Sequence, residues 1–80
     1  EENKKFIIAL QDVESKINKQ KDLIIYNNTP VTGFILPDLL YSLFNIEKNK
    51  IKVYPNDKVC PIENQCLKWN SNKKIIELNA

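Results

Sequence analysis

The chain has 80 residues, 42% of them hydrophobic, and a formal net charge of only +2 at pH 7. This length suits one small domain spanning residues 1–80, which would bury roughly 60–65% of the surface that its unfolded chain exposes. The composition argues against a disordered chain, and no apolar run approaches the ~20 residues that cross a bilayer. The first residue, Glu1, is not Met, which is expected of a processed protein or an excised segment.

All twelve basic residues are lysines, and the chain has no histidine. Together with eleven asparagines and eleven isoleucines, this bias indicates an AT-rich genome rather than a nucleic-acid surface. A DNA-reading protein generally uses Arg for bidentate contacts with guanine. The low net charge points the same way, because ten carboxylates are interspersed with the lysines.

Residues 3–21 have the periodicity of an amphipathic helix. Phe6, Leu10, Val13 and Ile17 recur at helical spacing, so they would share one apolar face. That face must be buried against another element of the fold.

Two strands are predicted on either side of a turn at residues 27–30. Residues 23–26 form a continuous apolar run, which is typical of a central strand buried on both faces. Residues 31–36 are the second candidate. Gly33, the only glycine, would mark a bulge or a close backbone approach there.

A short helix should follow, because Pro37 fits the first helical turn, where its missing N–H costs nothing. This helix should end near Asn45. Its apolar face would consist of Leu39, Leu40, Leu43 and Phe44.

The C-terminal half predicts three strands. Residues 50–54 alternate between lysine and apolar side chains, which predicts a half-buried strand with Ile51 and Val53 facing inward. Residues 65–70 and 74–79 predict a hairpin whose inward side chains are Leu67, Trp69, Ile76 and Leu78. The fold class is therefore α+β: a two-layer sandwich in which both helices pack on a small mixed sheet with a C-terminal hairpin. The strands of this sheet would be residues 23–26, 50–54, 66–70 and 74–78.

The two cysteines, Cys60 and Cys66, are separated by five residues. A zinc site needs about four ligands, and without histidine two of them would have to be carboxylates. A redox motif would have two intervening residues. A structural disulfide and two ordinary thiols remain, and the thin core favours the disulfide. It would imply an oxidising compartment, periplasmic or extracellular.

The chain offers few catalytic designs. Without histidine, Ser–His and Cys–His pairs are impossible, and one glycine is too few for a phosphate-binding loop. A lysine base or a carboxylate pair stays open, although the spacing singles out no acidic pair. We therefore predict that the protein is not an enzyme, that it binds no cofactor or metal, and that it has no catalytic residue.

A partner-binding site is predicted on the strand at residues 50–54. Strand edges recruit partners, and an outward Tyr54 would bury a large area at low entropy cost. Lys50 and Lys52 would flank it. The same lysines, with Lys48, would equally suit a phosphate backbone or protect an edge strand from pairing.

The order of segments suggests one family. The segments are a first helix, then Leu23-Ile24-Ile25-Tyr26, Val31-Thr32-Gly33-Phe34, Pro37-Asp38-Leu39-Leu40-Tyr41-Ser42-Leu43-Phe44 and Ile51-Lys52-Val53-Tyr54. Over residues 6–54 this order resembles the short N-terminal domain of secretins and TonB-dependent receptors, and small accessory proteins of pilus secretins are similar. The resemblance implies a periplasmic two-layer module that mediates docking and ring assembly in secretion, pilus or signalling machinery, without catalysis. The chain departs from the family in lacking a strand before the first helix and in having the Cys60–Cys66 loop.

Three functions follow from these observations. The first is a non-catalytic module that binds another protein, such as a component of a cell-envelope secretion or pilus system. The second is a small inhibitor or immunity-type protein that blocks its partner. The third is a small nucleic-acid-binding protein, which the absence of arginine and the low charge disfavour.

Overall fold

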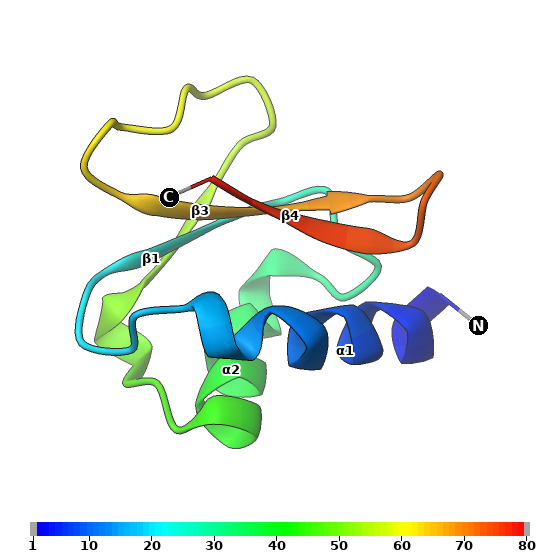
Figure 1. The fold of residues 1–80 in the computed structure, drawn as a ribbon, viewed down its shortest axis with the longest axis horizontal. Helices are drawn as coiled ribbons and strands as arrows, with labels where there is room; N and C mark the ends of the chain where they lie inside the picture. The colour runs from blue at the N-terminus through cyan, green and yellow to red at the C-terminus, as the bar shows by residue number, and fades with distance from the viewer. Residues whose placement is uncertain (1, 80) are drawn as a thin grey trace.

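A computed structural model describes residues 2–79 and shows two helices lying on one side of a four-stranded sheet (Figure 1). The helices are α1 (Glu2–Val13) and α2 (Leu36–Phe44). The strands are β1 (Leu23–Tyr26), β2 (Ile51–Tyr54), β3 (Gln65–Asn70) and β4 (Ile75–Asn79). Three short 3₁₀ turns are η1 (Glu14–Lys16), η2 (Gly33–Ile35) and η3 (Lys48–Lys50). The predicted α+β fold with helices packed on a mixed sheet is confirmed.

The strand order in the sheet is β2-β1-β3-β4. Strand β1 runs parallel to both β2 and β3, and β3 and β4 form the predicted antiparallel hairpin. The crossover from β1 to β2 contains α2 and lies on the helix side of the sheet. The crossover from β2 to β3, residues 55–64, lies on the opposite side (Figure 1). The second crossover runs across the sheet in the opposite direction to the first and lies on the opposite face, so the two crossovers have the same handedness. Connections between parallel strands strongly prefer one handedness.

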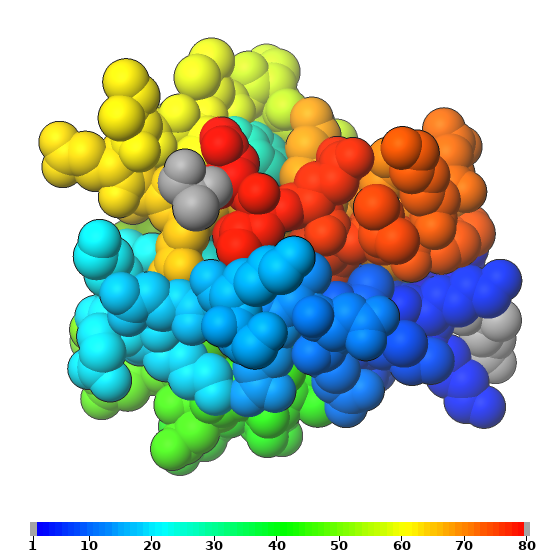
Figure 2. All heavy atoms as spheres, viewed as in Figure 1, coloured from blue at the N-terminus to red at the C-terminus, as the bar shows by residue number. Residues whose placement is uncertain are grey.

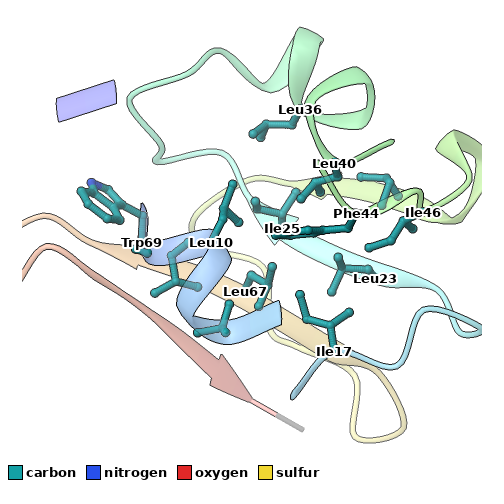
Figure 3. Close-up of a cluster of buried hydrophobic side chains, with 14 of the residues drawn as sticks. Leu10, Ile17, Leu23, Ile25, Leu36, Leu40, Phe44, Ile46, Leu67 and Trp69 are labelled. Carbon is teal, nitrogen blue, oxygen red and sulfur yellow. The ribbon is translucent and has the colours of Figure 1, made fainter. Parts of the chain in front are cut away.

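The main core lies between the helices and the sheet (Figure 3). Helix α1 buries Phe6, Ala9, Leu10 and Val13, three or four residues apart, because this stripe faces the sheet. The Phe6 ring meets the Trp69 indole edge to face, with centroids 5.4 Å apart. The inward orientation predicted for the strand residues is confirmed, with Leu78 packed at the border of the core.

Strand β1 is buried on both faces, as its apolar run predicts. Leu23 and Ile25 belong to the helix-side core, whereas Ile24 and Tyr26 pack with Cys66 on the opposite face. The second face therefore has its own small cluster, beneath residues 55–64.

The first helix is shorter than residues 3–21. Helix α1 ends at Val13 and the turn η1 follows, while Ile17 has an extended backbone, with φ −88° and ψ 130°. Ile17 is still buried in the core. The apolar spacing therefore predicted its burial correctly, although its backbone is not helical. The Gln65 side chain pins the chain after the turn, accepting from the Asn18 N–H at 2.9 Å and donating to the Asn18 carbonyl at 2.7 Å.

The predicted strand at residues 31–36 is wrong. This segment contains the turn η2 and leads directly into α2, where Pro37 occupies the first helical turn. Phe34 is left exposed and Leu36 is buried, so the apolar residues do not pack as a strand would. The close approach predicted at Gly33 is correct, since a Cβ there would lie 2.6 Å from Asn27 Oδ1 and 3.0 Å from Val53 Cγ1.

Helix α2 ends where the sequence predicts. Asn45 takes the left-handed conformation, with φ 60°, and its N–H donates to the Tyr41 carbonyl at 2.9 Å. Asparagine tolerates this conformation better than most residues, which explains the stop.

Candidate partner-binding surface

Residues 55–64, here called the crossover loop, cover part of the sheet face that the helices leave free. The loop consists of two tight turns, closed by hydrogen bonds from Lys58 N–H to the Pro55 carbonyl and from Asn64 N–H to the Pro61 carbonyl, each 3.1 Å. Asn56 and Asp57, the two central residues of the first turn, are residue types that turns favour. The loop therefore has local structure of its own before it contacts the sheet.

A disulfide attaches the crossover loop to strand β3. It joins Cys60 to Cys66, whose Cα atoms lie 6.3 Å apart, and so confirms the predicted pairing. Both thiols are used by this bond, which weakly supports an oxidising environment.

Two tyrosines hold the loop from below. The Tyr26 hydroxyl donates to the Lys58 carbonyl at 2.7 Å, and the Lys58 ammonium lies 4.2 Å from the centre of the Tyr54 ring. The two tyrosine rings meet edge to face at 6.3 Å. The ammonium of Lys68 lies 5.5 Å from the Tyr26 ring. The hydrogen bond and the cation–π contact thus hold the loop at Lys58, and the disulfide holds it at Cys60.

The crossover loop exposes two apolar side chains. Val59 is 83% exposed and Ile62 is 96% exposed, and they flank the Cys60-Pro61 pair. In the space-filling view the loop, in yellow, stands out from the body of the molecule (Figure 2). Contiguous exposed apolar patches generally mark contact surfaces, and these two side chains lie three positions apart on one short segment. Among the large apolar side chains of residues 2–79, Phe34, in η2, is also almost fully exposed.

The three residues predicted to bind a partner are divided between two surfaces. Strand β2 does form an edge of the sheet, and Lys52 and Tyr54 lie on the crossover-loop face. Tyr54 is half-buried, because Tyr26 and Lys58 pack against its ring, so less of it is available than an outward side chain would offer. Lys50 belongs to η3 and lines a separate hollow beside Phe44 and Glu47.

A hollow of about 320 Å³ lies between the loop and the sheet. It carries Lys58, Lys68 and Glu77 together with asparagine side chains, so its charge is mixed. Tyr26 forms part of its floor but is only 6% exposed, which prevents a nucleic-acid base from stacking on its ring.

Residues 2–79 contain no group of three His, Cys, Asp or Glu side chains placed to hold a metal ion.

The pKa values of two side chains that lie away from the crossover loop are clearly shifted. The Asp38 carboxylate raises the pKa of Lys48, and the hydrogen bond from Lys74 lowers the pKa of Glu2. Within residues 2–79, every helix is too short or too polar to span a bilayer.

Sequence reasoning missed Val59 and Ile62, because single apolar residues among turn formers have no periodicity. A usable signal was present, since Val59 precedes Cys60 and Ile62 lies between the two cysteines, in a segment rich in Pro, Asn and Asp. A segment of this composition is expected to be an exposed loop, and a disulfide would restrain its backbone, so its apolar side chains would be presented in a fixed position.

Comparisons with protein-family models, curated proteins and solved structures find no match to this chain.

Proposed function

We propose that this domain is a non-catalytic module that binds another protein through the crossover loop. The observation that carries the proposal is the near-complete exposure of Val59 and Ile62 on a loop that a disulfide attaches to the sheet. Burying one such side chain contributes about 1.5–3 kcal/mol. An already ordered loop loses little conformational entropy on binding, so more of this energy becomes affinity.

The setting we propose is an oxidising compartment of the cell envelope. The disulfide supports this location, since such bonds persist in the periplasm and outside the cell. Apart from residues 31–36, which form a turn instead of the predicted strand, the order of segments resembles the short N-terminal domain of secretins, and this supports a docking role in a secretion or pilus assembly. The missing histidines and phosphate loops support a role without catalysis.

A second candidate is a small inhibitor, and the crossover loop favours it for a specific reason. Ile62 follows Pro61 in a tight turn, so it projects as a single apolar side chain that fits a narrow cleft. An inhibitor would abolish its partner's activity at one-to-one stoichiometry, whereas an assembly module would leave it intact. The activity of the captured partner therefore separates these two functions.

The test is quantitative affinity capture from the native source with the immobilised domain. A Val59→Ser, Ile62→Ser double variant should retain at most about a tenth of the partner, because two apolar contacts are lost. Ile8→Ser is the matched control, since Ile8 is also an exposed isoleucine but lies on α1. Lys52→Glu tests the β2 edge in the same way.

Full capture by the double variant would contradict the proposal. So would turnover of a small molecule by the purified domain, provided that no partner is recovered. Loss of capture with Lys52→Glu but not with the double variant would move the binding site to strand β2.

A further inference from the structure

We infer that strand β4 accepts an extended segment of a partner protein as a fifth strand of the sheet, at a surface separate from the crossover loop. Strand β4 is outermost in the sheet, and among residues 2–79 no strand pairs with its outer side. Figure 2 shows β4, in red, at the surface between α1, in blue, and the crossover loop, in yellow. Its outward N–H and C=O groups are free for main-chain hydrogen bonds.

The two edges of the sheet differ in protection. Strand β2 has only four residues, carries Lys52 and is followed at once by Pro55, which are devices that discourage pairing. Strand β4 has five residues and contains neither proline nor lysine. Its first residue, Ile75, is 44% exposed. The edge predicted from the sequence to bind a partner is therefore the protected one, and β4 is the open one.

A groove beside β4 would receive side chains of the added strand. Helix α1 runs along this strand, and a hollow of about 220 Å³ between them is lined mainly by apolar side chains. The lining residues are Ala9, Asp12, Val13, Lys16, Ile75 and Ile76. Every second side chain of an added strand points to the helix side, so apolar residues at those positions would enter this groove.

On the other face of β4, Glu77 is the one charged side chain of the strand, and it shares a hollow with Lys58 and Lys68. Glu77 faces Lys68 in the hairpin register, yet the two form no ion pair within the described chain, because the Lys68 ammonium lies over the Tyr26 ring. The Glu77 carboxylate accepts a hydrogen bond from the Asn70 amide at 3.3 Å. A Lys or Arg beside Glu77 on the incoming strand would complete a favourable cross-strand pair.

A second copy of this chain fits the edge poorly. An antiparallel pair of β4 strands centred on Glu77 would place two glutamates directly opposite each other, which is destabilising. The occupant we assign is therefore a different chain, with apolar residues at alternate positions and a Lys or Arg between them.

Two peptides test this assignment by NMR titration of the ¹⁵N-labelled domain. The first is acetyl-Thr-Val-Lys-Val-Thr-amide, and the second has Glu in place of Lys. The first should shift amide signals of Ile75 to Asn79 and of Ala9 and Val13, and should bind about threefold more tightly than the second. Glu77→Lys should reverse this preference, whereas Lys52→Glu, on the opposite edge, should leave it unchanged.

Three results would overturn the inference: no shifts at millimolar peptide, shifts confined to β2 or to the crossover loop, or equal binding of both peptides. Dimerisation of the free domain through β4, seen by sedimentation and by shifts in the same residues, would also overturn the assigned occupant. The Val59→Ser, Ile62→Ser variant should bind the peptides normally. Failure of this inference is thereby distinguished from failure of the proposed function.

Discussion

The two faces of the sheet are covered in different ways. On the helix side, fifteen buried residues from both helices, all four strands and the connecting segments form one cluster. On the loop side, the buried cluster is Ile24, Tyr26 and Cys66, and a disulfide, one hydrogen bond and a cation–π contact hold the cover in place. The first face stabilises the fold through apolar burial. The second needs few buried side chains, and the apolar side chains Val59 and Ile62 of its cover stay exposed.

The largest effect should come from placing a charge in the helix-side core. Leu10 is fully buried, so Leu10→Asp would bury a carboxylate without a partner and should unfold the domain. Far-UV circular dichroism and thermal melting measure this loss. Ile8→Asp is the matched control, because Ile8 is exposed on the same helix, and it should melt close to the parent. If both variants melt with the parent, α1 is not docked on the sheet.

The loop side should be weaker but measurable. Replacing both Cys60 and Cys66 by Ser should lower the free energy of unfolding by about 2 kcal/mol, since the disulfide closes a short loop. The helix-side core is untouched, so the variant should still be folded at the start of a urea titration, in buffer without urea. Intact mass after alkylation, with and without reductant, verifies the bond in the parent. Two free thiols in protein from its native compartment would contradict the structure.

A double-mutant cycle sharpens the comparison further. Tyr54→Leu and Lys58→Gln remove the two partners of the cation–π contact, and their coupling in urea unfolding should be about 0.5–1 kcal/mol. Lys68→Gln paired with Tyr54→Leu is the control, because Lys68 lies over the other tyrosine. Coupling no larger than in this control would mean that Lys58 does not hold the loop.

The same contrast explains what could be predicted from the sequence. Segments that contribute to the helix-side core carry regular apolar patterns, so α2, all four strands and the first part of α1 were predicted. Ile17 and residues 31–36 were misread, because burial of an apolar residue does not require the secondary structure that its spacing suggests. After the helix ends, the Asn18 backbone bonds to the Gln65 side chain instead of to a helical partner. These two residues are 47 positions apart in the sequence, so no local pattern predicts the contact.

The candidate site was harder to predict for a related reason. Spacing and composition favoured the pairing of Cys60 with Cys66 over two free thiols, and the structure contains this bond. The exposure of Val59 and Ile62, and the packing of Tyr54 against Lys58, depend on how residues 55–64 cross the sheet. No local pattern encodes that path. The lysines of residues 50–54 suggested edge protection as well as binding, but only the strand order shows which strands are edges.

The smallest effect should come from an exposed ion pair that joins the two layers. Lys74, at the turn of the hairpin, pairs with Glu2 in the first turn of α1, and its hydrogen bond lowers the pKa of Glu2 below the ordinary glutamate value. A carboxyl with a lowered pKa in the folded protein contributes stability above its unfolded pKa, and this is lost as the pH falls through the folded pKa.

Glu2→Gln should therefore lower the melting temperature slightly at neutral pH, by less than any change above, since exposed pairs contribute little. The difference from the parent should disappear in acid and shrink in 1 M salt, because both conditions remove the same attraction. Thermal melting across pH and salt measures it, with Glu63→Gln on the crossover loop as the control. A difference that persists in acid would mean that the Glu2 side chain stabilises the junction by packing rather than by charge.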